Sequence, residues 1–229
     1  MRELSRAVHA RRTRIRRGRH DGDSRERHEM DLTAHGARTP IPDALRASVL
    51  ERVRQLDRGA RAILMCASVI GRRFDIGILT ATVARSRNDI RAALECACVL
   101  QLIQEDRGGS ERFLFRHALT RDVLYAELLA IRTRPLHRRI ARALEATPDA
   151  SLENVAYHWW AAGDRRRGFR ANERAGDRAA EIHANGVALV HYNRALGFAE
   201  LDSECYTRLS EKIRVAKVRA GRGRFRVTR

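Results

Sequence analysis

Hydrophobic positions change their spacing within residues 112–129, which read RFLFRHALTRDVLYAELL. Phe113 and Phe115 follow the two-residue period of a half-buried strand. From His117 onward, apolar side chains recur every three to five residues, as on one face of a helix; they are Leu119, Val123, Leu124 and Leu128. The pattern predicts a strand that runs directly into an amphipathic helix. Arg116 and His117 lie at the junction, where the free N–H groups of a helix start favour anions.

Upstream of this stretch, the apolar spacing predicts four helices. The first begins near Pro42, the second covers about residues 58–70, and the third covers about residues 75–84. Ser86 has the position of an N-cap residue for the fourth helix, in a capping-box-like arrangement. Two short apolar segments then flank Gly108 and Gly109, which predicts a β-hairpin. Helices followed by such a hairpin predict a winged helix.

Beyond residue 132 the apolar spacing is helical throughout. Pro135 suits the first turn of one helix, and Ser151 opens the next. Further helices are expected at about residues 166–184 and 187–200, and the segment ALVHYNRALGF is similar to the first helix of a tetratricopeptide unit. Such helix pairs stack on their neighbours because a lone pair cannot bury its own apolar face.

The predicted fold class is therefore mainly α. A winged helix with one small β-hairpin occupies residues 40–132, and antiparallel helix pairs, like the start of a tetratricopeptide solenoid, occupy residues 133–211. Residues 1–39 carry 11 Arg and 6 acidic residues and lack sustained periodicity, so we expect a disordered basic arm. Residues 212–229 carry 8 basic residues and no acid, which predicts a basic tail.

The net charge of +18 is concentrated in these two end segments. All the basic residues except Lys212 and Lys217 are Arg. Such a bias fits the base composition of a gene better than selection for phosphate contacts. The charge alone is therefore a weak argument for a nucleic-acid partner.

Two segments resemble a known family. FRHAL followed by VLY and LL, together with ASVIGRRFD, is similar to the winged-helix domain of bacterial STAND-class signalling ATPases. These include the large LuxR-type transcriptional regulators and the cyclase-linked AAA ATPases, and the likeness covers about residues 40–200. In that family a winged-helix histidine touches the bound nucleotide, so the resemblance makes Arg116 and His117 nucleotide-sensor candidates.

The family binds ATP or ADP with Mg in a separate P-loop domain, whose motif needs a Gly-Lys dipeptide. This chain contains no such dipeptide. We therefore expect no cofactor in this chain and no enzymatic activity. It also lacks the DNA-binding module of LuxR-type regulators and the cyclase domain of their relatives.

Two functions are consistent with these patterns. The first is a non-catalytic fragment of a STAND-type regulator that acts in signal transduction, with a protein partner or inducer bound by the helical repeats. The alternative is a small basic winged-helix transcriptional regulator that reads DNA with its fourth helix. The DNA-contact candidates stand at the start of that helix: Arg85, Arg87, Asn88 and Arg91. The adjacent Trp159 and Trp160 are expected to pack in the core of the repeats.

The remaining patterns concern the environment of the cysteines, metal binding and membrane spans. Cys66, Cys96 and Cys98 lie in helical apolar segments, where free cysteine acts as a small hydrophobe. The His and Cys residues show no metal-ligand spacing, so we expect no metal site. No apolar run approaches the ~20 residues of a membrane span, and the N-terminus lacks the apolar segment of a secretory signal. We expect a cytoplasmic protein with no membrane partner.

Overall fold

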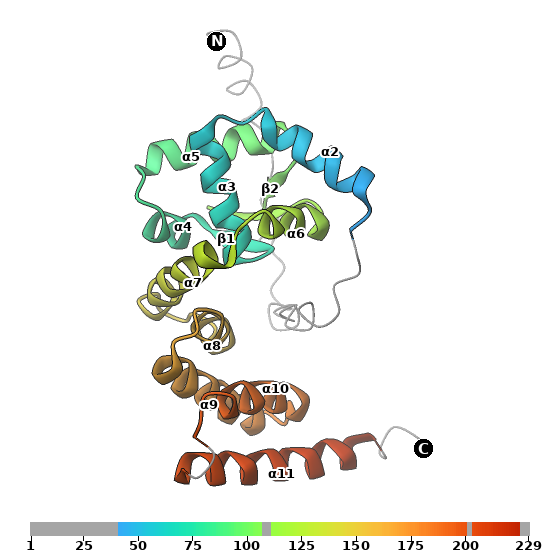
Figure 1. Cartoon of the computed structure of the whole chain (residues 1–229), viewed down its shortest axis with the longest axis vertical. Coiled ribbons are helices and arrows are strands. Elements are labelled where there is room, and N and C mark those ends of the chain that lie inside the picture. Colours follow the sequence, from blue (N-terminus) through green and yellow to red (C-terminus); the bar gives the residue numbers. More distant parts are fainter. Residues whose placement is uncertain (1–40, 107–110, 201–202, 225–229) are drawn as a thin grey trace, which may run out of the picture. The chain divides into compact units, whose positions relative to one another are not determined.

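Helices account for most of the secondary structure in the computed structural model, which describes residues 41–106, 111–200 and 203–224 (Figure 1). The prediction of a mainly α fold is confirmed. Three short strands form one small antiparallel sheet. The predicted basic arm and the predicted hairpin turn at Gly108 and Gly109 lie outside the described residues.

The first elements follow the predicted order, with one additional short strand, β1. They are α2 (Asp43–Arg54), α3 (Arg58–Ile70), β1 (Arg73–Asp75), α4 (Ile76–Thr82), α5 (Arg87–Val99), β2 (Ile103–Glu105) and β3 (Arg112–Phe115). Asp57 begins α3 by accepting a hydrogen bond from the Ala60 N–H at 2.7 Å. The predicted cap of α5 is confirmed, because the Ser86 hydroxyl accepts from the Asp89 N–H at 3.1 Å. At the start of α2, Pro42 occupies the N-cap position and no side chain caps the helix.

The sheet has one strand more than the sequence predicted. β1 pairs with β3, which also pairs with β2, so the strand order is β1-β3-β2. The predicted third helix was therefore placed one residue too early, since Asp75 ends β1 and caps α4. Three residues are too few to display a two-residue period, which is why the pattern did not indicate β1. Phe74 of β1 lies against Phe113 of β3 with 5.9 Å between ring centres.

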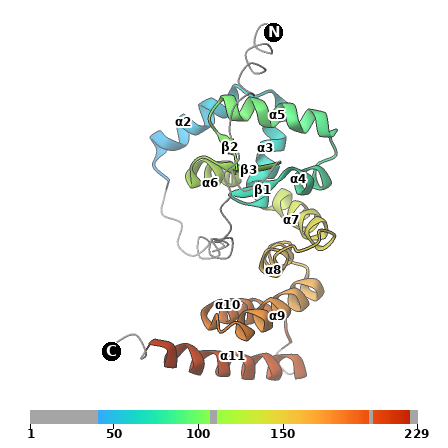
Figure 2. The same ribbon diagram turned by 180° about the vertical axis from the view of Figure 1, so that it is seen from behind.

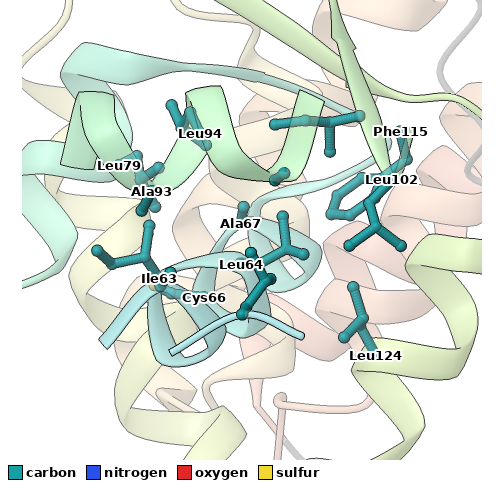
Figure 3. Packing of buried hydrophobic residues seen from close by; sticks show 14 of the residues in the cluster. Ile63, Leu64, Cys66, Ala67, Leu79, Ala93, Leu94, Leu102, Phe115 and Leu124 are labelled. Atoms are coloured by element: carbon teal, nitrogen blue, oxygen red, sulfur yellow. The ribbon is translucent and has the colours of Figure 1, made fainter. Parts of the chain in front are cut away.

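The largest core forms where α3, α5, the sheet and the helix after β3 meet. Figure 3 shows Leu64 and Ala67 of α3 facing Leu94 of α5, with Phe115 and Leu124 beside them. All five side chains are almost completely buried. Burial of each large apolar side chain contributes about 1.5–3 kcal/mol, so this cluster fixes the position of β3 and of the helix that follows it.

The cysteines divide by environment. Cys66 packs inside this core, and burial raises the pKa of its thiol to about 12. Cys98 is half-buried, whereas Cys96 lies on the exposed side of α5. The expectation that all three are small core hydrophobes is therefore wrong for Cys96.

The rest of the described chain is helical. It consists of α6 (Ala118–Ala126), α7 (Ala130–Glu145), α8 (Leu152–Ala161), α9 (Arg165–Glu181), α10 (Asn185–Leu196) and α11 (Glu204–Arg224). From α7 onward, each helix packs against the next one along the chain. We call α8 to α11 the helical array. Ser151 caps α8 as predicted, because its hydroxyl accepts from the Asn154 N–H.

Helix α7 joins the two predicted domains. It contacts α3 and α4 on one side and α8 on the other. Because α7 runs from Ala130 to Glu145, the predicted boundary between residues 132 and 133 falls inside a helix. The described residues from position 41 onward group into one compact unit. Pro135 lies inside α7 and not in its first turn, because the helix already begins at Ala130.

Residues 212–224 of the predicted basic tail belong to the last helix, and residues 225–229 lie outside the described residues. Helix α11 continues to Arg224, and it packs along α10, as Figure 2 shows from the opposite side. Leu209, Ile213 and Ala216 are buried against the preceding helices. Helix α11 therefore has an apolar face between the basic residues that suggested a tail.

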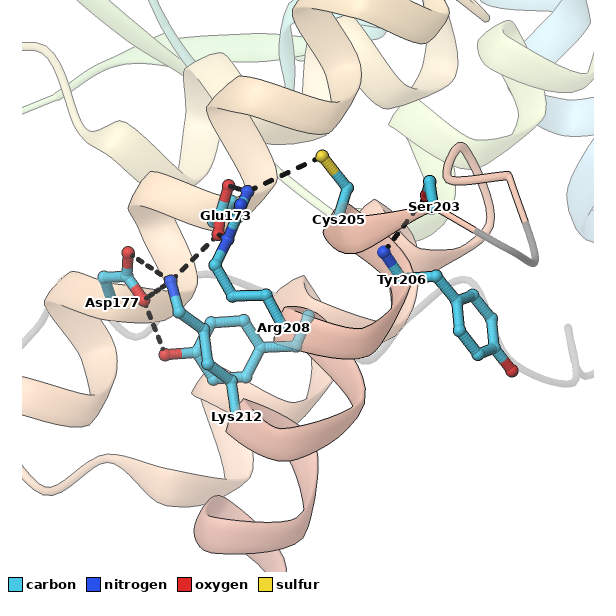
Figure 4. Close-up of polar contacts among 8 residues, drawn as sticks. Glu173, Asp177, Ser203, Cys205, Tyr206, Arg208 and Lys212 are labelled. Carbon is cyan, nitrogen blue, oxygen red and sulfur yellow. Dashed lines mark hydrogen bonds and ion pairs between the residues drawn. The ribbon is translucent and has the colours of Figure 1, made fainter.

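An ionic cluster holds α11 to α9 (Figure 4). Arg208 makes a bidentate pair with Glu173, at 2.9 and 3.1 Å. Lys212 donates to Glu173 at 2.9 Å and to Asp177 at 2.8 Å. The Tyr192 hydroxyl of α10 also donates to Asp177, at 2.8 Å. The cluster therefore joins three consecutive helices. Within the described residues, no helix has the length and apolarity that a membrane crossing requires.

Candidate interaction site

The two nucleotide-sensor candidates lie where the sequence placed them. Arg116 and His117 connect β3 to α6, and both side chains are exposed. His117 is the N-cap residue of α6, but its side chain makes no capping hydrogen bond. The Thr120 N–H donates instead to the His117 carbonyl at 3.0 Å. The strand-to-helix junction is as predicted, and the nucleotide-sensing role stays a prediction.

The four DNA-contact candidates also lie together at the start of α5. Arg85, Arg87, Asn88 and Arg91 are all exposed. Arg87 and Arg91 both pair with Glu111, which directly precedes β3, at 2.5 and 3.2 Å. The hydrogen bond from Arg87 lowers the pKa of Glu111. One carboxylate therefore pairs with two of the four candidates, which the sequence could not indicate because Glu111 is 20 residues or more from each of its partners.

The two tryptophans of α8 differ in environment. Trp159 is fully buried, and its indole N–H donates to the Glu145 carboxylate at 2.7 Å. Trp160 is 37% exposed. The prediction of a core role is confirmed for Trp159 and wrong for Trp160. Successive residues of a helix point about 100° apart, so one member of an adjacent pair has to leave the core face.

Trp160 belongs to a surface shared by α8 and α10. Tyr157 and Trp160 are three residues apart on α8, and their ring centres are 6.2 Å apart. The Arg194 guanidinium of α10 lies 4.7 Å from the Trp160 ring and 5.5 Å from the Tyr157 ring. Val187 and Val190 are exposed on the same face of α10 as Arg194. We call these five residues the α8–α10 surface.

Two polar atoms next to this surface are buried without a partner. Neither Nη1 of Arg194 nor Nε2 of His191 hydrogen-bonds any described residue. The other ring nitrogen of His191 bonds the Asn172 side-chain oxygen at 3.0 Å. Burial lowers the pKa of Arg194. Burial, and then the neighbouring Arg194 charge, lower the pKa of His191 to about 4. A buried donor without an acceptor costs free energy, so these two atoms mark a locally unfavourable part of the α8–α10 packing.

A buried polar network joins the α8–α10 surface to the sheet-containing half of the chain. The Nδ1 atoms of His137 and His158 lie 2.8 Å apart, and the Tyr125 hydroxyl bonds Nε2 of His137 at 3.1 Å. Because one Nδ1 must donate and the other accept, both rings cannot be fully protonated. Burial, followed by the neighbouring His137, lowers the pKa of His158 well below its usual range. Tyr157 packs edge-on against His158, with 5.2 Å between ring centres.

Comparison with protein-family models, with curated proteins and with solved structures found no match for this chain. Nowhere in the part of the chain that the structure describes do three His, Cys, Asp or Glu side chains form a group that could hold a metal ion. The function is therefore argued from the geometry of the surfaces described above.

Proposed function

We propose that this chain is a non-catalytic interaction module of a bacterial signalling regulator, and that its helical array binds a protein partner through the α8–α10 surface. One observation carries the proposal. Arg194 is held over the rings of Tyr157 and Trp160, beside two exposed valines, and forms no ion pair with any described residue. Trp, Tyr and Arg are the residues that most often dominate binding energy at protein interfaces.

The chemistry of the surface defines the partner. A guanidinium stacked on aromatic rings is already positioned, so it loses little side-chain entropy when it pairs with a carboxylate. Val187, Val190 and the exposed part of Trp160 offer apolar area on the same helices. We therefore infer a partner segment that carries an acidic side chain beside aliphatic or aromatic ones. Stacked helix pairs commonly bind partners in this way, along an extended surface.

The family resemblance supports the same role. In STAND-class ATPases the winged helix docks on the nucleotide-binding domain, and the repeats bind a partner or inducer. By analogy, α3 to α6 would dock on a nucleotide-binding protein, with the exposed Arg116 and His117 at the contact. The four cysteines are all free thiols, which supports a reducing cytoplasmic setting.

The partner surface can be tested with a phage-displayed library of random dodecapeptides. We expect enriched peptides to combine an acidic residue with a neighbouring aliphatic or aromatic residue. Their affinity should fall at least tenfold in Trp160→Ala and in Arg194→Gln, which is about 1.4 kcal/mol or more. Val218→Ala on α11 provides a matched control, since Val218 is also an exposed apolar residue and lies outside the surface. Peptides that bind both variants as tightly as the wild type would refute this surface.

DNA binding by α5 remains the second candidate, because four exposed polar side chains lie at or just before its start. The decisive test is selection from a pool of randomised 20-base-pair duplexes at 150 mM salt. An enriched sequence that Arg91→Gln no longer prefers would establish base readout by α5, provided that the control Arg138→Gln, an exposed arginine of α7, still prefers it. Without a preferred sequence, any binding is nonspecific attraction to the net charge of +18 and should weaken steeply with salt.

A further inference from the structure

A cavity of about 410 Å³ lies between the end of α7, the start of α8 and the first half of α9. Its apolar lining comes from Leu144, Ala150, Leu152, Val155 and Ala171. The volume falls within the range of small-molecule sites, which is about 300–1,000 Å³. None of the lining residues belongs to the α8–α10 surface, so this cavity is independent of the proposed partner site.

Three arginines of α9 line the same cavity. Arg167, Arg170 and Arg174 are spaced by three and four residues, which places them on one face of the helix. Within the described residues, none of the three forms an ion pair with a carboxylate. Arg167 is held in place because its guanidinium lies 4.6 Å from the ring of the buried Trp159. An anion in the cavity would therefore meet three guanidinium groups, of which that of Arg167 is already positioned.

Two carboxylates also line the cavity, and they reduce its positive charge. Glu145 accepts the Trp159 indole N–H, and Asp149 belongs to the turn between α7 and α8. The charged side chains of the lining therefore sum to +1, from three arginines and two acids. A ligand that places its anionic group on the arginine side and its apolar part against Leu152 and Val155 fits both portions of the lining.

We propose that this cavity binds a small organic anion, with a phosphoryl or carboxylate head group on an apolar body. The guanidinium groups supply the two-point hydrogen bonding that both head groups accept. The apolar lining supplies affinity that free inorganic phosphate cannot use, because phosphate has no apolar surface to bury.

The test uses the full chain, titration calorimetry at 150 mM NaCl, and four probes: 1-naphthyl phosphate, 1-naphthoate, inorganic phosphate and 1-naphthol. We expect one or both of the naphthyl anions to bind at least tenfold more tightly than phosphate or naphthol. Whichever anion binds more tightly identifies the preferred head group. Equal affinity for phosphate and for the naphthyl anions would overturn the proposal, because it would reduce the site to general attraction of anions.

Variants separate the cavity from the overall positive charge. Arg170→Gln and Arg174→Gln should each weaken binding of the better probe at least tenfold. Arg166→Gln is the matched control, because Arg166 is exposed on the same helix and does not line the cavity. Ala171→Leu should also weaken binding, since it fills the cavity and leaves every arginine in place. If Arg166→Gln weakens binding as much as Arg170→Gln does, the cavity is not the site.

Discussion

Phe115 and His117 are two residues apart, yet we expect their side chains to contribute very differently to stability. Phe115 is fully buried, so Phe115→Ala should lower the free energy of unfolding by about 3–5 kcal/mol. His117 occupies the N-cap position of α6. Its side chain caps nothing and is exposed, so His117→Ala should cost less than about 0.5 kcal/mol. Urea unfolding measures both values, and a cost above 1 kcal/mol at His117 would reveal a contact that the geometry lacks.

The buried histidines make stability depend on pH. Unfolded histidine has a pKa of about 6.5, whereas His158 and His191 stay neutral in the fold to a much lower pH. The unfolded chain therefore binds more protons below pH 6.5, and the folded state loses stability as the pH falls from 6.5 towards 4. At pH 5 the loss from His191 should be about 2 kcal/mol, and His158 adds a loss in the same direction.

Denaturant unfolding between pH 7.5 and 5 tests this prediction. His191→Gln should reduce the stability at pH 7.5, because it disturbs the bond to Asn172, but it should also reduce the pH dependence by about 2 kcal/mol at pH 5. His183→Asn is the control, since His183 is exposed and asparagine tolerates its positive φ of 60°. A stability that is flat across this pH range would contradict the buried neutral histidines.

At the scale of elements, two glycines distinguish packing from helix propensity. A Cβ atom at Gly176 of α9 would lie 2.5 Å from the Tyr192 ring, whereas one at Gly186 of α10 would meet nothing within 4 Å. Gly176→Ala should therefore lower the free energy of unfolding by about 1–3 kcal/mol, because the Tyr192 hydroxyl is tied to Asp177 and its ring cannot easily move. Gly186→Ala should raise it by up to about 1 kcal/mol. Thermal melts compare the two, and a stabilising Gly176→Ala would show that α9 and α10 are less closely packed.

The attachment of α11 depends on charge as well as on apolar contact. Hydrogen bonds from Arg208, followed by those from Lys212, lower the pKa of Glu173. Glu173→Gln weakens both attachments, so we expect the amides of α11 to exchange with solvent about two- to tenfold faster. Glu211→Gln removes a pair with Arg214 that lies within α11, and it should leave the exchange nearly unchanged. Similar acceleration in both variants would mean that the cluster does not attach the helix.

The elements that the sequence predicted well are those whose signals are local. The apolar spacing of α3 and α5, the Ser86 and Ser151 caps and the junction at His117 each depend on residues within a few positions of one another. Such signals are read directly from the chain. The mainly α class and most helix positions follow from them.

Features that depend on distant pairing could not be predicted in this way. β1 is recognisable only through its pairing with β3, and the stacking of Arg194 on Trp160 joins residues far apart in the sequence. The length of α11 was missed for a different reason. The basic residues after position 211 drew attention to charge, although Ile213 and Ala216 continue the apolar face that begins at Leu209.

For the molecule as a whole, the contrast between the two tryptophans has an optical consequence. They are the only tryptophans in the chain, and one is enclosed while its neighbour reaches water. Acrylamide should therefore quench the native fluorescence in two unequal fractions, and Trp160→Phe should remove the accessible one. If the array loosens, Trp159 should become accessible to the quencher. If a partner occupies the α8–α10 surface, Trp160 should instead become protected from it. A single emission measurement therefore distinguishes binding from unfolding.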